Sequence, residues 1–306
     1  TSEQARQYNE RIIIQCVRRE QEVSRAKLAT LTALSAQTIS VITSSLIDAE
    51  LLTVVGREYG GRGQPSIKLA VNPQGAYGVG VNLDRDHIST SLVDFSGRLL
   101  QKYHCELLYP SVEQARKQVG EDLQRMRQQL GDSWHRVRGV GLAMPRKMGS
   151  WLKELGLCSE ENERHDEIAT RLDEWNRVDF AGQLQELSGL DVVCENDAGA
   201  AAVGELFYGL GHRYSSFFYL FLGMSLGRGI ISEGQYFRGA RGNAADFGLF
   251  PVCAGRGKPD GMLMSEVSLA SLYRYLRKQG IDVSSPEQLQ LLYDGAGKEA
   301  IEHWIQ

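Results

Sequence analysis

Long apolar runs, paired cysteines and an export signal are all missing from this 306-residue chain. The longest apolar run, residues 217–222, is far short of the roughly 18 residues that a membrane-spanning helix needs. No charged-then-apolar leader opens the sequence, so we expect a cytoplasmic protein with no membrane partner.

The five cysteines are too scattered to organise a structure. They are odd in number and never form a C-x-x-C pair, which argues against a disulfide framework and against a zinc ribbon. We therefore expect reduced thiols. The composition, 42% hydrophobic and 24% charged, is that of a globular chain of about two domains, and it excludes disordered, collagenous and coiled-coil proteins.

The net charge of −4 conceals an uneven distribution. Residues 1–72 hold nine Lys and Arg against seven Asp and Glu, whereas the remainder holds 25 against 31. A slightly basic head in front of an acidic body is compatible with DNA binding, but a difference of this size is weak evidence. Whether the head binds DNA must therefore be inferred from its motifs.

Three helices are predicted in the head. Apolar residues between positions 8 and 19 recur at helical spacing and indicate a helix with one buried face. Ser24 and Ser35 are each placed to cap a further helix, a short one from residue 25 and a longer one over about 36–49. The outer face of the longer helix carries short, uncharged polar side chains, as a reader of the major groove needs. These residues are Gln37, Thr38, Ser40, Thr43 and Ser44.

Two strand-like runs, 51–55 and 67–71, flank a glycine-rich segment, and together with the helices they have the layout of a winged helix-turn-helix. Arg62 at the tip of the wing is placed to enter a minor groove or to hold a phosphate. A helical protein-interaction module with a flexible hairpin is the alternative. The predicted DNA-binding residues are Arg25, Gln37, Thr38, Ser40, Ser44 and Arg62.

The periodicity changes at a turn-rich junction, 72–75, which separates a winged helix-turn-helix domain, 1–72, from a body, 73–306. The alternation of sheet and helix in the body indicates an α/β fold. The predicted strands are 79–83, 87–93, 98–107, 137–143 and 192–194, and the predicted helices are 112–130 and 198–208.

Two stretches of the body carry chemistry. Asn196 and Asp197 stand where a buried strand gives way to a helix, at the edge where open α/β sheets place their ligands. Asp197 either contacts a ligand hydroxyl or caps the following helix, and the two roles are compatible. The second stretch, 221–249, is punctuated by glycine, which permits a close approach of backbone to a ligand but also marks plain tight turns.

Several segments are specific in combination: the head 24–52, the wing 61–65, Glu195-Asn196-Asp197-Ala198, and Gly239-Ala240-Arg241-Gly242-Asn243-Ala244. From about residue 11 to 272 the chain resembles the ROK family (repressors, open reading frames and sugar kinases). It is most similar to the transcription-factor branch, with the N-acetylglucosamine and xylose repressors, which joins a winged helix-turn-helix to an actin-like sugar-kinase body. The resemblance implies a sugar or sugar-derivative effector, a homodimer or homotetramer, and control of carbohydrate genes.

The phosphate-binding loops depart from the family's kinases. Those kinases carry Asp-x-Gly-Gly-Thr to cradle ATP, whereas the matching stretch here is Asn82-Leu83-Asp84-Arg85-Asp86. Two carboxylates would lie beside the negatively charged phosphates of ATP, and Arg85 would offset this repulsion only in part. The second loop, usually Gly-Thr-Gly, is Gly223-Met224-Ser225. We therefore predict that kinase activity is lost, and that no cofactor is bound.

Most of the family's zinc ligands are also missing from this chain. Leu249 replaces the His of Gly-Glu-x-Gly-His, and only Cys253 remains of a three-cysteine cluster, so we predict no metal. Arg171 lies four residues before Trp175, where the family often has a sugar-contacting Asn, and a guanidinium would suit an acidic or phosphorylated effector. Alternatively, Arg171 lies on a solvated face and the pocket is vestigial. The predicted effector-binding residues are Asn196, Asp197, Asn243, Asp246 and Arg171.

The leading hypothesis is a DNA-binding repressor of carbohydrate-metabolism genes, with double-stranded operator DNA as partner and a sugar as effector. Effector binding would shift the populations of cleft states and change the spacing of two heads in a dimer. The alternatives are a carbohydrate kinase that uses Asp197 as base, and a ligand-independent DNA-binding protein. The family body usually continues beyond the end of this chain, where we expect residues 291–304 to form one terminal amphipathic segment.

Overall fold

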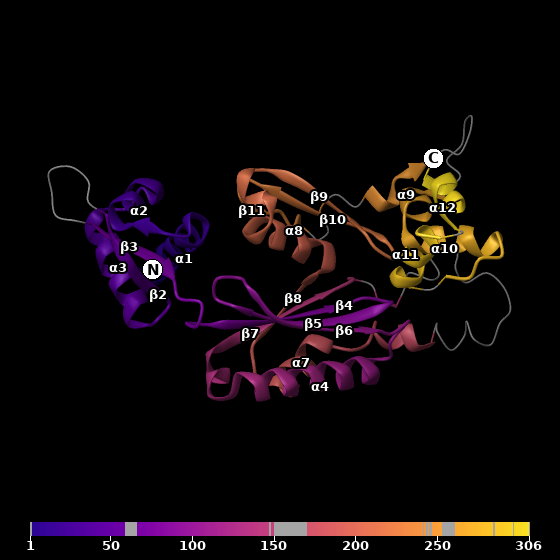
Figure 1. Ribbon diagram of the computed structural model, residues 1–306, viewed down its shortest axis with the longest axis horizontal. Helices are drawn as coiled ribbons and strands as arrows, with labels where there is room; N and C mark the ends of the chain where they lie inside the picture. The colour runs from indigo at the N-terminus through magenta and orange to yellow at the C-terminus, as the bar shows by residue number, and fades with distance from the viewer. Residues whose placement is uncertain are drawn as a thin grey trace.

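The computed structural model describes most of the chain, namely residues 2–58, 66–146, 148–149, 170–240, 242, 244, 247–252, 261–283, 285–295 and 297–305. The elements are arranged along one long axis (Figure 1). The head, which comprises α1 to β3, lies at one end, and the C-terminal helices lie at the other. We call everything from β4 onward the body.

The head consists of three helices and a three-stranded antiparallel sheet of order β1-β3-β2. Helices and sheet bury a common apolar core that includes Ile13, Leu28, Ile39 and Leu69. The first helix begins earlier than the apolar spacing predicted, because its first turns are polar and exposed. The elements are α1 (Ser2–Glu20), β1 (Val23–Ser24), α2 (Arg25–Thr32), α3 (Ala36–Asp48), β2 (Leu52–Glu58) and β3 (Ser66–Val71).

Side-chain caps fix the start of the second and third helices, as predicted. The Ser24 hydroxyl accepts a hydrogen bond from the Lys27 amide, and the Ser35 hydroxyl accepts one from the Thr38 amide. Between the helices, Ala33 adopts a left-handed conformation with φ of +55°, and the chain bends by 117°. A bend of this size is typical of a helix-turn-helix.

Among the described residues, no single helix is long and apolar enough to cross a membrane. The pair α2 and α3 meets the criteria of length and composition only when its two bent members are taken together. Both helices contribute buried residues to the core of the head, among them Leu28 and Ile42.

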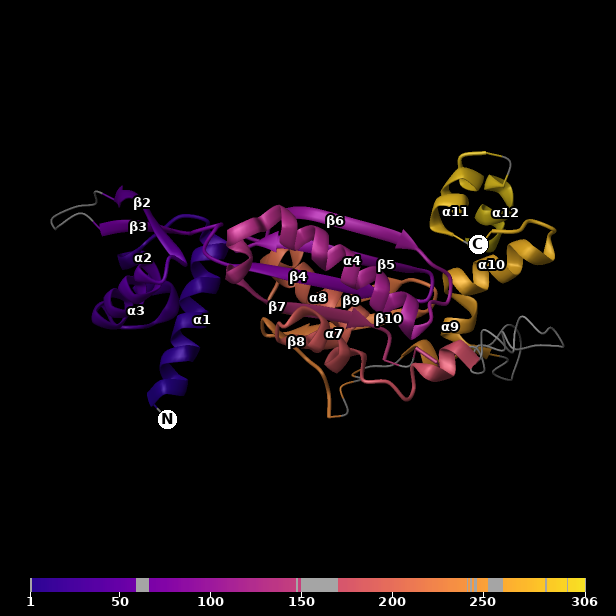
Figure 2. The same ribbon diagram turned by 90° about the horizontal axis from the view of Figure 1, so that it is seen from below.

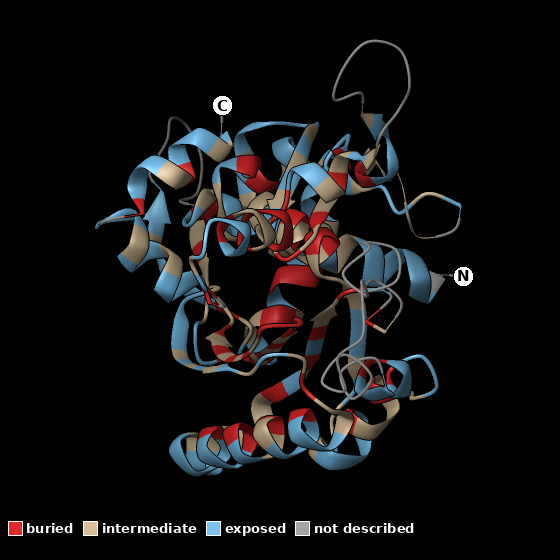
Figure 3. Cartoon of the chain, turned by 90° about the vertical axis from the view of Figure 1, so that its right-hand side faces the viewer, coloured by how far each residue is buried: buried red, intermediate tan, exposed pale blue. Residues whose placement is uncertain are grey.

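The body is built around a mixed five-stranded sheet of order β6-β5-β4-β7-β8. β4, β5 and β6 form an antiparallel meander, and β7 and β8 add parallel to β4. Helices α4 and α7 cover one face (Figure 1), and α4 turns its buried side to the sheet at the foot of Figure 3. The elements are β4 (Tyr77–Leu83), β5 (His87–Asp94), β6 (Leu99–Glu106), α4 (Val112–Leu130), η1 (Gly131–Arg136), β7 (Val137–Met144), α7 (Phe180–Ser188) and β8 (Val192–Asn196).

A helix and a small antiparallel sheet of order β11-β10-β9 lie over the other face (Figure 1). The helix packs very closely on β10: a Cβ on Gly229 would overlap the Cβ of Ala202, and one on Gly227 would lie 2.8 Å from the Cβ of Ala198. Glycine is therefore required where helix and strand meet. The elements are α8 (Asp197–Tyr208), η2 (Leu210–Arg213), β9 (Phe217–Leu222), β10 (Leu226–Ser232) and β11 (Gln235–Tyr236).

The C-terminal part has its own small apolar core, centred on Leu272, Leu276 and Ile301. The expectation of one terminal segment over 291–304 is wrong, because two short helices occupy this region and Gly295 and Gly297 lie between them. The elements are η3 (Phe247–Leu249), β12 (Pro251–Val252), β13 (Gly261–Met262), α9 (Leu263–Glu266), α10 (Leu269–Lys278), α11 (Pro286–Tyr293) and α12 (Lys298–Ile305).

The contact between α8 and β10 can be tested with one methyl group. We expect Gly229→Ala to lower the free energy of unfolding by about 1–3 kcal/mol, because the methyl group overpacks the interface with Ala202. Gly204→Ala is the matched control, since it adds the same group to α8 at a point with nothing within 4 Å and should be neutral or slightly stabilising. Urea unfolding of both variants measures the difference, and equal stabilities would contradict the packing described.

Candidate functional site

The outer face of α3 presents most of the side chains predicted to read DNA. Gln37, Ser40 and Ser44 are exposed, and Thr38 is half-buried at the first turn of the helix. The hydroxyls of Ser35 and Thr38 are 2.8 Å apart, so the capping residue also holds the Thr38 side chain. The predicted residues of α3 thus lie on one surface at the N-terminal part of the helix.

Arg25 at the start of α2 joins this surface. Its Nη2 donates a hydrogen bond of 3.0 Å to the Ser44 hydroxyl, and its Nη1 lies 3.5 Å from the Ser40 hydroxyl. Burial lowers the pKa of Arg25 from its ordinary value, but a guanidinium remains charged at any physiological pH. Three of the predicted residues therefore form one hydrogen-bonded group with a positive charge.

The placement of Thr43 on the outer face is wrong. Thr43 is fully buried, and its hydroxyl donates a 2.7 Å hydrogen bond to the carbonyl of Ile39, one turn earlier. This bond satisfies the hydroxyl inside the helix, so the methyl group can pack with the apolar inner face.

Val41 takes a place on the outer face that the sequence reasoning missed. Its side chain is 60% exposed. The sequence does indicate this position, because residues 37, 40, 41 and 44 follow the i, i+3, i+4, i+7 spacing of one helical face. An apolar side chain on a groove-reading helix can contact the methyl group of thymine. Arg62, the predicted anchor of the wing, lies outside the described residues.

Asn196 and Asp197 lie at the junction of β8 and α8, at the carboxyl edge of the sheet, as predicted. The capping role belongs to Asn196 and not to Asp197: the Asn196 side chain accepts a hydrogen bond from the Gly199 amide. Asp197 is the first helical residue, and its Oδ1 accepts a 2.7 Å bond from the Ala198 amide. The Asn196 side chain also hydrogen-bonds the Asp197 carboxylate, so the two residues are joined at this edge of the sheet.

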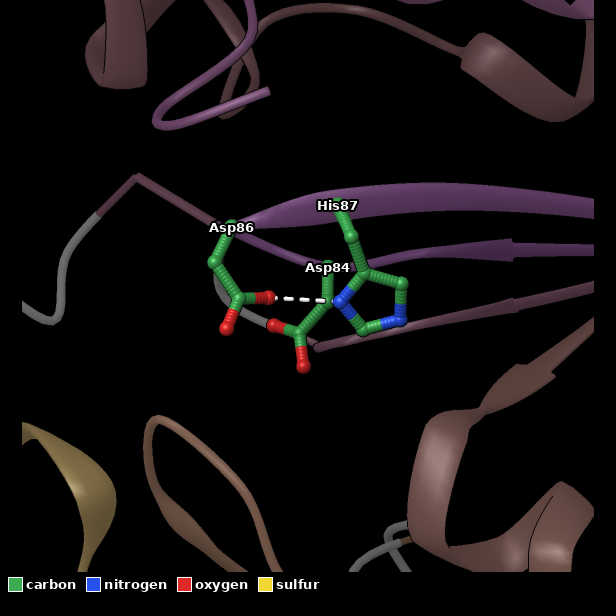
Figure 4. Close-up of side chains that lie close together, drawn as sticks. All are labelled: Asp84, Asp86 and His87. Atoms are coloured by element: carbon green, nitrogen blue, oxygen red, sulfur yellow. Dashed lines mark hydrogen bonds and ion pairs between the residues drawn. The ribbon is translucent and has the colours of Figure 1, made fainter. Parts of the chain in front are cut away.

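The turn between β4 and β5 holds three buried charged residues, Asp84, Arg85 and Asp86, which are 4%, 5% and 7% exposed. The sequence suggested that these carboxylates face an open phosphate-binding loop, but in the structure they are buried. Asp84 accepts a 2.7 Å hydrogen bond from the Arg85 amide, and its Oδ1 lies 3.7 Å from Arg85 Nη1. Asp86 pairs with His87 at 2.6 Å (Figure 4).

Electrostatics link this turn to Asp197. Burial, together with the nearby Asp84 carboxylate, raises the pKa of Asp197 to about 6. Burial also raises the pKa of Asp84 and lowers the pKa of Arg85. The negative charges of Asp84 and Asp197 act in the opposite direction on Arg85 and favour its charged form. The hydrogen bond to Asp86 raises the pKa of His87. The guanidinium of Arg85 thus neutralises carboxylates of both segments.

Asp84, Asp86 and His87 each offer one atom suited to a metal, and these atoms all lie within 4.8 Å of one another (Figure 4). The Arg85 guanidinium beside Asp84 places a positive charge against a cation there. The prediction that zinc is not bound rests on Cys253, which lies outside the described residues, and on Leu249.

The structure tests the other predicted effector residues only in part. Asn243 and Asp246 lie outside the described residues. Arg171 is exposed on a helical turn before Trp175, whose indole donates a 2.9 Å bond to the Pro110 carbonyl. No described contact joins Arg171 to Asn196 or Asp197. A cavity of about 10 Å³ beside Asn196, bordered by Arg228 and Tyr236, holds no more than a single water.

A larger cavity, of about 640 Å³, lies on the sheet face that α8 and β11 overlie. Its polar lining escaped the sequence reasoning, although alternate residues of β5 and β6 supply much of it. Within the lining, Arg238 pairs with Glu195 at 2.7 Å, and the side chains of Ser89 and His104 are 2.7 Å apart. Of the predicted effector residues, the three that the structure describes, Asn196, Asp197 and Arg171, do not line it.

Residues 78–259, more than half of the chain, match the ROK family. The chain belongs to the ROK family. It is 24% identical over 244 residues to the xylose repressor of Bacillus spizizenii, covering 80% of this chain and 60% of the repressor. It is 26% identical over 208 residues to a glucokinase of Thermotoga maritima, covering 65% of this chain and 60% of the kinase.

A crystal structure described as a ROK family transcriptional regulator, homologue of the E. coli MLC protein, superposes with a TM-score of 0.58 at 20% identity, covering 84% of this chain and 63% of the other. This likeness shows the fold: the body is an α/β unit of the actin-like, sugar-kinase type. The ROK chain described here thus spans about three fifths of the length of these relatives.

The burial of Asp197 predicts a pH-dependent stability. Since its pKa in the folded chain, about 6, exceeds the ordinary 3.8, the group contributes stability that is present below about pH 4 and is lost as the pH rises through about 6. Asp197→Asn should therefore raise the free energy of unfolding by about 1–3 kcal/mol near pH 7.5 and change it little near pH 4.

Chemical unfolding of both proteins across this range measures the effect. Asp191→Asn, which makes the same substitution at an exposed position, is the control for the substitution itself. A constant difference between wild type and Asp197→Asn at every pH would contradict the electrostatic origin.

Proposed function

We propose that this ROK protein is a DNA-binding repressor of carbohydrate-metabolism genes, which responds to a sugar or sugar derivative held in a non-catalytic kinase-like cleft. The observation that carries the proposal is the polar face of α3, where Arg25 joins Ser40 and Ser44 after a 117° bend between the helices. A groove-reading helix needs this combination of short polar side chains and positive charge. The similarity to a xylose repressor supports the same function.

In this proposal, residues 1–72 are a winged helix-turn-helix domain and residues 73–306 are the effector-binding and oligomerisation domain. α3 reads base edges with Gln37, Thr38, Ser40 and Ser44, and Arg25 adds positive charge beside them. β2 and β3 form the wing, whose Arg62 contacts the DNA backbone. A homodimer or homotetramer would present two such heads to an operator of double-stranded DNA, with half-sites one helical turn or a multiple of it apart.

The β4–β5 turn supports a lack of catalysis. Phosphoryl transfer depends on positioning the phosphates and neutralising their charge. Here Asp84 and Asp86 occupy the turn, and the Arg85 charge is held by carboxylates. Asn196 and Asp197 keep their place at the edge of the sheet, so a sugar hydroxyl can bind there without being phosphorylated. Asn243, Asp246 and Arg171 remain proposed effector contacts.

One observation favours the alternative of a sugar kinase. The pKa of about 6 for Asp197 suits a general base near neutral pH. Sugar-dependent ATP consumption that Asp197→Asn abolishes would establish this alternative. A DNA-binding protein without an effector, the third candidate, would bind its operator but gain no thermal stability from any sugar.

Gel shifts on the DNA upstream of the gene test the reading surface. We expect Thr38→Ala to weaken specific binding by about five- to 150-fold, the loss of one base contact. Arg62→Ala should weaken binding to all sequences and reduce the slope of its salt dependence by about one. Lys117→Ala, which removes an exposed charge from α4 of the body, is the control. Wild-type binding by both head variants would show that the reading surface is wrong.

Calorimetric titration tests the effector. We expect binding of a sugar acid or sugar phosphate, with D-glucuronate and glucose 6-phosphate as probes, in preference to D-glucose and D-xylose, because Arg171 supplies a guanidinium. Arg171→Gln should remove this preference and leave the affinity for neutral sugars unchanged, whereas Asp197→Ala should weaken both classes. A wild-type preference for a neutral hexose would contradict the role given to Arg171.

A further inference from the structure

One arginine of the head reaches into the body. Arg18, near the end of α1, donates a 2.8 Å hydrogen bond from Nη2 to the carbonyl of Phe95. Its guanidinium carbon lies 5.2 Å from the centre of the Phe95 ring and 5.7 Å from that of the Tyr208 ring. Both distances fall within the range of cation–π attraction. We call this group of three residues the clamp; α1 is the helix of the head nearest to the body in both views (Figures 1 and 2).

The body holds its part of the clamp firmly. Phe95 belongs to the β5–β6 turn, in which the Asp94 carboxylate accepts hydrogen bonds from the amides of Ser96 and Arg98. Gly97 in the same turn has a φ of +91°, and a Cβ there would overlap the Tyr208 ring. The Phe95 amide also donates a 3.0 Å bond to the carbonyl of Pro73, in the connection between head and body.

Tyr208 is the last residue of α8, whose first residue is Asp197. A helix of this length, 12 residues, spans about 18 Å. The close packing on β10 holds α8 as one rigid element along the contacts of Ala198 and Ala202. A small displacement or rotation at the effector end of α8 therefore moves the Tyr208 ring against Arg18.

A cavity between the head and the end of α8 leaves space for the head to move. A cavity of about 440 Å³ separates α1 and α2 from the end of α8, with Ile12, Leu31 and Phe207 in its lining. A second tie lies at the connection, where Arg136 pairs with Glu50 at 2.6 Å and donates to the Gln74 carbonyl. With one tie at the connection and the clamp beside a cavity, a shift of Tyr208 can turn the head about the connection.

We infer that the clamp of Arg18 between Phe95 and Tyr208 sets the orientation of the head on the body, and that α8 transmits the state of the effector site to it. The clamp is a positioning device, because none of its residues belongs to the proposed DNA or sugar contacts. The coupling part of this inference rests on the proposed function, whereas the contact itself does not.

Hydrogen exchange of the unliganded 306-residue chain tests the contact alone. We expect Arg18→Ala and Tyr208→Ala each to raise the exchange rates of amides at the end of α1 and in the β5–β6 turn by about fivefold or more. Tyr208 is 56% exposed, so its variant leaves the core intact even if Arg18→Ala destabilises the head. Tyr208→Phe, which keeps the ring, and Arg19→Ala, which removes the exposed neighbour of Arg18, should match wild type. Unchanged exchange in both clamp variants would overturn the inference.

Coupling is measured as the ratio of DNA affinities with and without a saturating sugar found by calorimetry. Typical couplings change affinity by about five- to 150-fold. In the clamp variants we expect the ratio to fall below about twofold, while sugar affinity and sugar-free DNA binding stay within about threefold of wild type. A wild-type ratio in both clamp variants would refute the coupling. A wild-type chain that ignores every sugar would refute the proposed function and the coupling with it, and the exchange experiment would still decide the contact.

Discussion

The close packing of α8 on β10 is the constraint on which the rest of the body depends. Glycine in the strand and alanine in the helix bring the two backbones together, with no side chain between them. This contact fixes the start of α8, and with it Asp197, against the turn that carries Arg85. The same helix carries Tyr208 at its far end, where it meets the head. One helix–strand interface thus determines the geometry of two sites at opposite ends of the same helix.

Buried charge is the second theme of the structure. Isolated charges are very unfavourable inside a protein, so each must find a partner or become neutral. Arg85 lies among carboxylates of two segments that are distant in sequence, Asp84 and Asp197, and the His87 ring pairs with Asp86 at 2.6 Å. A region that serves phosphate in the family's kinases is thereby balanced by the protein's own side chains. In the proposed function, this self-neutralisation is the physical reason why the cleft would bind a sugar without phosphorylating it.

Local signals in the sequence predicted much of the fold. Apolar periodicity gave helix 112–130 with its observed ends, and the serines before two helices of the head act as caps. The errors at Thr43, Val41 and the C-terminal segment are local, whereas the remaining failures concern long-range contacts. The two-residue strand β1 exists only through its pairing with β3, and the burial of Asp84 and Asp86 follows from the packing of the β4–β5 turn. The 640 Å³ cavity is lined by strands whose spatial order cannot be read along the chain.

The hydrogen bonds from Arg25 to Ser40 and Ser44 have a consequence for the thermodynamics of recognition. Three side chains that would otherwise sample several rotamers are held in one arrangement before any ligand arrives. Ordering a side chain at an interface costs about 0.5–1.5 kcal/mol, and here that entropy is lost during folding instead. The surface is preorganised, so association there would carry a smaller entropic penalty than on a helix with freely rotating serines.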